Sequence, residues 1–128
     1  MKCENCGYTN PPAMFEEIPE WERPVVIAIC EEVFALDLIL SIHDGNDPAD
    51  PEDFSVCRSL DDCSKVVGEC EHQIFRILPK DDRSFLQYPL GWFSLIYDNG
   101  SEGEGLVVVS DYSANDLCET IYQKAAKR

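Results

Sequence analysis

The chain has 128 residues and carries 10 lysines and arginines against 25 aspartates and glutamates, which gives a net charge of −15. This length fits one domain, and 45% hydrophobic residues are enough for one core. The acidic balance argues against binding to nucleic acid or to an anionic membrane surface, because both need a positive face, and no stretch approaches the ~18 apolar residues of a membrane-spanning helix.

The first 23 residues predict an irregular lead. The start of the chain has Glu4 and no apolar segment of a secretory signal, so we expect a cytoplasmic protein. Pro11 and Pro12 exclude a helix in this part of the lead. We therefore expect the lead at 1–23 and a single α+β domain at 24–128.

The first regular elements are expected directly after the lead. Pro24 suits the first turn of a helix, and the apolar residues that follow to Phe34 form a stripe on one helical face. A strand over 25–30 is the alternative. Residues 36–43 alternate between apolar and polar side chains, which is typical of a half-buried strand.

The middle of the chain predicts a loop, a strand, a helix and a second strand. Residues 44–53 hold five acids and two prolines and indicate an exposed loop, and a short strand can follow at 54–58. Ser59 precedes an acid by three residues, which predicts a helix start, and an apolar stripe continues to Cys70. Residues 72–78 form the next expected strand.

The last third predicts two strands and a terminal helix. Strands are expected at 91–97 and 106–110, joined by a loop that contains Asn-Gly. Ser113 is the expected cap of a helix that continues to Lys127. The element order favours a mainly antiparallel sheet of four to five strands with two or three helices packed on one face.

Seven cysteines form an odd and fairly large set. In a reducing compartment we expect free thiols or metal ligands rather than a disulfide framework. Cys30, Cys63 and Cys118 lie on apolar faces of the expected helices, where cysteine packs as a small hydrophobic residue.

Cys3 and Cys6 stand in a Cys-x-x-Cys-Gly-Tyr segment. This segment resembles the first knuckle of rubredoxins and zinc ribbons, and the resemblance implies a zinc site with these two thiolates as ligands. A closed tetrahedral site needs four ligands, and the second Cys-x-x-Cys of those families is absent. Cys70 and His72 are the first candidates to complete it; Cys30, Cys57 or a second subunit are the alternatives.

Motifs of known catalytic sites are absent from the sequence. A thiol next to a histidine is the remaining arrangement for nucleophilic chemistry. Cys70 or Cys57 with a histidine therefore gives the alternative of a small hydrolase or transferase.

The acidic residues are clustered along the chain. Residues 1–71 hold 17 acids and four bases, and residues 98–119 hold six acids and no base. Clustered charge accelerates association with a partner of opposite sign. The sequence thus predicts a non-enzymatic binding module for a basic protein, similar in charge to inhibitors and immunity proteins. The candidate partner-binding residues are Asp44, Asp47, Asp50, Glu52, Asp53, Asp98, Glu102 and Glu104, with Trp92 as an aromatic anchor.

Overall fold

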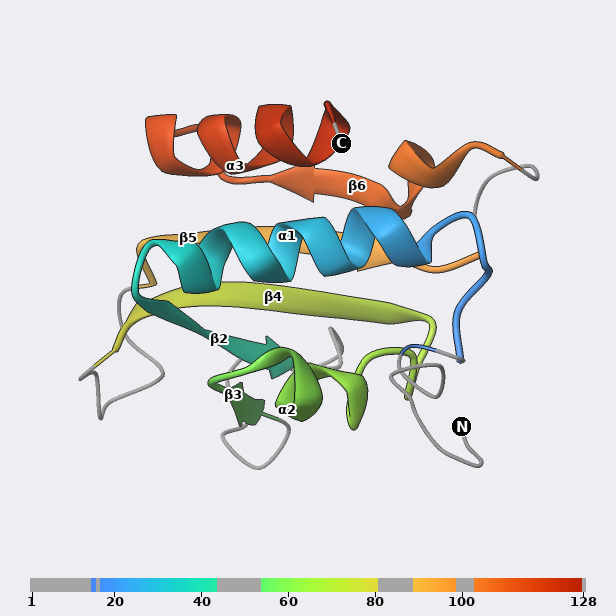
Figure 1. The fold of residues 1–128 in the computed structure, drawn as a ribbon, viewed down its shortest axis with the longest axis horizontal. Helices are drawn as coiled ribbons and strands as arrows, with labels where there is room; N and C mark the ends of the chain where they lie inside the picture. Colours follow the sequence, from blue (N-terminus) through green and yellow to red (C-terminus); the bar gives the residue numbers. More distant parts are fainter. Residues whose placement is uncertain (1–14, 16, 44–53, 81–88, 99–102, 128) are drawn as a thin grey trace.

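The computed structural model describes residues 15, 17–43, 54–80, 89–98 and 103–127. These residues form three α-helices, one 3₁₀ helix and a five-stranded antiparallel sheet, so the predicted α+β class is confirmed (Figure 1). The strand order is β3-β2-β4-β5-β6. The elements are α1 (Arg23–Ala35), β2 (Leu38–His43), β3 (Phe54–Cys57), α2 (Leu60–Ser64), β4 (His72–Pro79), β5 (Gly91–Ile96), η3 (Gly105–Val108), β6 (Val109–Tyr112) and α3 (Asp116–Ala126).

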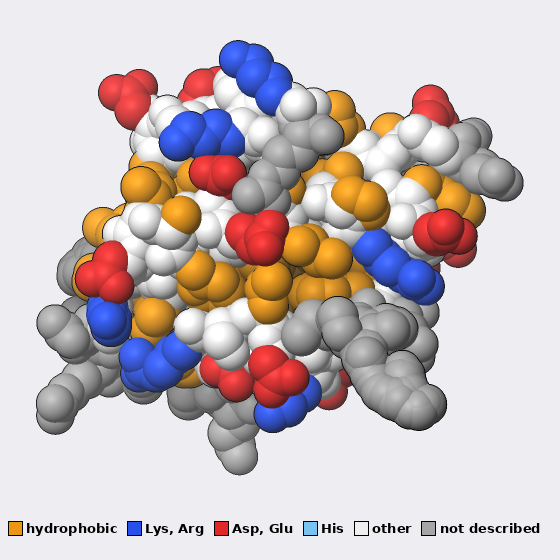
Figure 2. Space-filling view, viewed as in Figure 1, with side chains coloured by type: hydrophobic (Ala, Val, Ile, Leu, Met, Phe, Trp, Pro, Cys, Tyr) orange, Lys and Arg blue, Asp and Glu red, His pale blue; other side chains and the backbone are white. Residues whose placement is uncertain are grey.

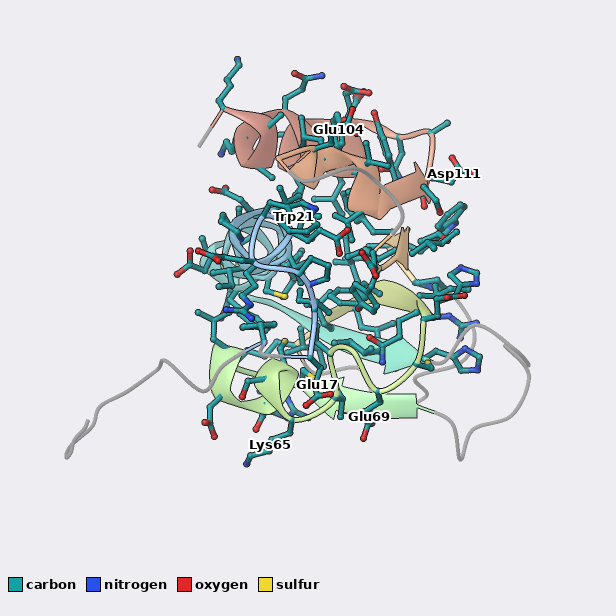
Figure 3. The ribbon with its side chains drawn as sticks, turned by 90° about the vertical axis from the view of Figure 1, so that its right-hand side faces the viewer. Glu17, Trp21, Lys65, Glu69, Glu104 and Asp111 are labelled. Carbon is teal, nitrogen blue, oxygen red and sulfur yellow. The ribbon has the colours of Figure 1, made fainter. Side chains whose placement is uncertain are left out.

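The described helices cover one face of the sheet, and none of them lies on the other face, which we call the helix-free face (Figures 1 and 3). Along β4 and β5 the side chains alternate in burial, because successive residues of a strand point to opposite faces. Phe75, Ile77, Phe93 and Leu95 point toward the helices and are fully buried. They form the centre of a core that α1 covers along its length.

Helix α1 settles the alternative between helix and strand at residues 25–30 in favour of the helix. Pro24 lies at its first turn, where a missing backbone N–H costs nothing. Asp37, just beyond the helix, adopts a positive φ of 63° and turns the chain into β2. Upstream of α1, Phe15 and Ile18 of the lead are buried in the core.

The helix expected to run from Leu60 to Cys70 is much shorter in the structure. Ser59 caps α2 as predicted, since its hydroxyl accepts the Asp62 N–H at 3.3 Å, but the helix ends at Ser64. Gly68 then adopts a φ of +89°, and the chain passes so close to Glu17 that no side chain fits. The apolar stripe therefore continues through turns rather than through a helix.

Two predictions for the C-terminal part were wrong in position. Residues 105–108 form η3 instead of a strand, and β6 begins only at Val109. Gly105 packs against the carbonyl of Trp21, which fixes this segment as a tight turn. The cap of α3 is Asn115 rather than Ser113: the Asn115 side chain accepts the Cys118 N–H at 2.9 Å.

Among the residues with an assigned position, none of the helices is both long and apolar enough to span a membrane.

Candidate binding surface

The helix-free face of the sheet carries a pocket of about 340 Å³. The pocket is formed by two neighbouring rows of side chains that run across the strands. In one row Arg76 lies opposite Trp92, and in the other Ser94 lies between Ile74 and Asp111. These five residues line the pocket. They come from β4, β5 and β6, so a regular hydrogen-bonded sheet holds the site.

Ser94, which lines the pocket, belongs to a chain of polar side chains. The Ser94 hydroxyl lies 2.7 Å from His72 Nε2 and 3.0 Å from the Ser110 hydroxyl. Ser110 also donates to the Ser94 carbonyl oxygen at 3.0 Å. These contacts fix the Ser94 side chain between its neighbours, so this part of the pocket is preorganised.

Arg76 is half-buried at the side of the pocket. Desolvation by burial lowers the pKa of its guanidinium, although the group stays charged at neutral pH. Ser41 is paired with Arg76 on the adjacent strand β2, and its buried hydroxyl has no hydrogen-bond partner among the described residues. Buried hydroxyls without a partner are uncommon, which makes this row of the sheet unusual.

The sheet topology brings the end of β2, the start of β4 and the end of β5 to one end of the sheet. Strand β2 ends at His43, opposite Phe54 of β3, and β4 begins beside it at His72, opposite Ile96 of β5. We call this the His43 end of the sheet. The segments 44–53 and 99–102, which the structure does not describe, are covalently attached to described residues at this end.

Six exposed acidic residues lie at or beside the His43 end. Glu69 and Glu71 precede β4, Asp98 follows β5, and Glu104 precedes η3. Figure 3 views the molecule from this end and shows Glu69 and Glu104, together with Glu17, Asp111 and one base, Lys65. Exposed acidic residues from separate parts of the chain thus lie at or beside this end of the sheet.

Acids elsewhere on the described surface have basic partners in several places. Lys80 pairs with Asp37 at 3.2 Å, at the opposite end of the sheet from His43. Lys65 pairs with Asp61 at 3.4 Å. Lys124 contacts Glu32 at 3.8 Å and joins α3 to α1. Exposed pairs of this kind stabilise little, but they reduce the negative field where they occur.

The predicted partner-binding residues fall into two groups. Trp92 lines the pocket, and Asp98 and Glu104 lie at the His43 end. Six others cannot be placed, because they are outside the described residues: Asp44, Asp47, Asp50, Glu52, Asp53 and Glu102. The sequence did not single out Ile74, Arg76, Ser94 and Asp111 as site residues, although their alternation within strands was visible.

The predicted metal ligands are only partly described. Cys3 and Cys6 lie in the part of the chain without an assigned position. The Cys70 thiol donates to the His72 carbonyl oxygen at 3.4 Å, whereas the His72 ring contacts Ser94. Within the described ranges, no three or more His, Cys, Asp and Glu side chains are grouped to hold a metal ion. Zinc binding therefore stays a prediction.

Three buried thiols lie together between α1, α2 and β3. Cys63 is within hydrogen-bonding reach of both Cys30 and Cys57, and all three are free thiols, as expected for cysteines packed in a core. The hydrogen bond with Cys63, together with burial, raises the pKa of Cys57 far above its usual range. Because the thiolate is the nucleophile, this environment disfavours Cys57 as a catalytic residue.

The same thiols predict a loss of stability at alkaline pH. The pKa values of Cys57 and Cys63 are raised in the folded protein, so the folded state keeps both protonated. A cysteine in the unfolded chain ionises at about pH 8.5. The two buried thiols therefore contribute fully to the free energy of unfolding below that pH, and this contribution is lost as the pH rises above it. Under reducing conditions we expect the free energy of unfolding in urea to fall by about 2 kcal/mol between about pH 7.5 and about pH 9.5.

The variant Cys57→Ala isolates one of these two thiols. Its free energy of unfolding should fall by about 1 kcal/mol less than that of the wild type over the same pH interval. Equal declines for the two proteins, or no decline in either, would contradict this origin of the pH dependence.

The helix side of the molecule carries a second, apolar surface. Figure 2 shows hydrophobic side chains gathered over α1, and a pocket of about 340 Å³ lies between α1, η3 and α3. Leu106 and Val107 beside it are each 38% exposed. Nothing in the structure shows what covers this surface.

Comparisons with known proteins give no relative. No protein-family model matches the chain, and neither a curated protein nor a solved structure matches it significantly.

Proposed function

We propose that this protein is a non-enzymatic binding module that engages a basic protein through the His43 end of the sheet and the adjoining pocket. The observation that carries the proposal is the position of six exposed acidic residues at or beside that end. A concentrated negative field raises the association rate with a basic partner and weakens as salt is added.

Aromatic and polar groups next to the charge support the same role. Trp92 is half-buried in the pocket beside Asp111, which is exposed at the edge of the acidic surface. Tryptophan side chains are frequent anchors of protein interfaces, where charge alone gives little affinity. The pocket and the acidic end therefore supply an anchor and a steering field to one partner.

A defined basic peptide tests the location of the binding surface. The probe is a short peptide of alternating arginine and glycine, and the measurement is its dissociation constant at about 50 mM salt. In the triple variant Glu17→Gln, Glu69→Gln, Glu71→Gln, affinity should fall by about tenfold because three charges at the His43 end are lost. The control Asp37→Asn, Asp61→Asn, Asp116→Asn removes the same charge elsewhere and should stay within about twofold of the wild type.

The comparison between the two triple variants decides the outcome. A larger loss in the first than in the second supports the His43 end as the binding surface. Equal losses would mean that only the net charge matters, and the proposal of a specific surface would then be wrong.

A further inference from the structure

The pocket beside the His43 end has the size and position of a recognition site for a single side chain. Its volume of about 340 Å³ is at the lower end of the range that takes small ligands. It lies on three hydrogen-bonded strands, and Ser94 is fixed by its contacts with His72 and Ser110. Such a pocket binds without first having to order its own walls.

Two side chains of opposite charge, Arg76 and Asp111, line this pocket. The Asp111 carboxylate accepts the Tyr112 N–H at 2.9 Å and, among the described residues, has no ion pair. Arg76 lies on the neighbouring row and already has an interaction of its own. A cationic group that enters the pocket can therefore reach a carboxylate without an ion-pair partner among the described residues, in a pocket that Trp92 also lines.

A carboxylate beside an indole ring matches the chemistry of a guanidinium group. Guanidinium is planar and weakly hydrated, it stacks on aromatic faces, and it donates to carboxylates in a fixed geometry. An ammonium group is more strongly hydrated and lacks the planar face. Between the two cations found in proteins, this pocket favours arginine.

We propose that the pocket receives an arginine side chain of the basic partner, with the guanidinium between the Trp92 ring and the Asp111 carboxylate. This inference rests on the proposed function and adds the chemical group that is recognised. Ile74, Ser94 and Arg76 line the pocket with these two residues. Ile74 would contact the aliphatic part of the incoming side chain.

The test uses arginine amide as the probe, with citrulline amide as its neutral isostere. The chain has two tryptophans, so ¹⁵N spectra contain two indole N–H signals. The indole N–H of Trp21 is buried and away from the pocket, so it is an internal reference. Arginine amide should shift the Trp92 signal in a saturable way and leave the Trp21 signal unchanged. Citrulline amide should shift neither signal.

Two variants and a second ligand complete the test. Asp111→Asn should weaken arginine amide binding by about fivefold or more, because the charge-assisted contact is lost. Asp116→Asn is the matched control on α3 and should not change it. If acetyl-glutamate amide shifts the Trp92 signal and arginine amide does not, the pocket is an anion site at Arg76 and the proposal is overturned.

The arginine–glycine peptide separates a failure of this inference from a failure of the proposed function. If Trp92→Ala and Asp111→Asn leave peptide affinity unchanged while the triple variant at the His43 end lowers it, the arginine pocket is wrong and the binding module stands. If none of these variants changes peptide affinity, both are wrong. Thermal unfolding of each variant checks that a loss of binding is not a loss of folding.

Discussion

The variant Gly105→Ala is expected to lower the free energy of unfolding by about 3 kcal/mol. A Cβ atom at this position would lie 2.3 Å from the backbone oxygen of Trp21 and 3.1 Å from a methyl carbon of Val25. The first contact is with backbone, which cannot rotate away as a side chain can. Either the segment before α1 or the turn η3 must therefore move, and urea unfolding measures the cost.

Gly103 is a matched control in the same connection. It has a φ of +91°, but a Cβ atom there would meet nothing within 4 Å. Gly103→Ala should therefore cost only about 1 kcal/mol, from backbone strain alone. If Gly103→Ala destabilises the protein more than Gly105→Ala, the close approach of η3 to Trp21 is not present in the folded protein.

The variant Glu22→Ala is expected to lower the free energy of unfolding by about 2–3 kcal/mol. Glu22 is fully buried, and its two carboxylate oxygens accept the Asp98 N–H at 3.0 and 2.9 Å. Alanine would leave this N–H without its acceptor and a void where the side chain was. The contact joins the lead to the end of β5, so its loss should also loosen the His43 end.

Two further variants separate the charge of Glu22 from its hydrogen bonds. Glu22→Gln keeps one acceptor oxygen and should cost less than Glu22→Ala. Glu20→Ala removes the same charge from an exposed neighbour and should change stability by less than about 0.5 kcal/mol. A loss after Glu20→Ala as large as that after Glu22→Ala would contradict the role of the buried carboxylate.

The central strands could be predicted because their periodicity is strong. Residues 72–77 and 91–96 alternate in burial, and one face of each strand packs against the helices, so pattern and burial agree. The strand predicted at 106–110 was wrong for residues 106–108, because a tertiary contact overrides their strand propensity. Their valine-rich sequence suits a strand, but the contact of Gly105 with Trp21 bends the chain before β6 begins.

The candidate site could be predicted only in part. Trp92, Asp98 and Glu104 were found because aromatic and acidic residues are visible one at a time. The pocket was not, because Arg76, Ser94 and Asp111 come together only through strand pairing, and the sequence does not give the strand order. For the same reason, the sequence did not indicate that Glu69, Asp98 and Glu104 lie at one end of the sheet.

The most direct test of the account is affinity capture from a lysate of the cells that encode this chain. Wild type and the two triple variants serve as baits, and retained proteins are eluted by steps from about 50 to about 300 mM salt. We expect a strongly basic protein to be held by the wild type and by the control triple variant, to be released by salt, and to be lost with the His43-end triple variant. Recovery of no basic protein, or equal retention by both triple variants, would contradict the account.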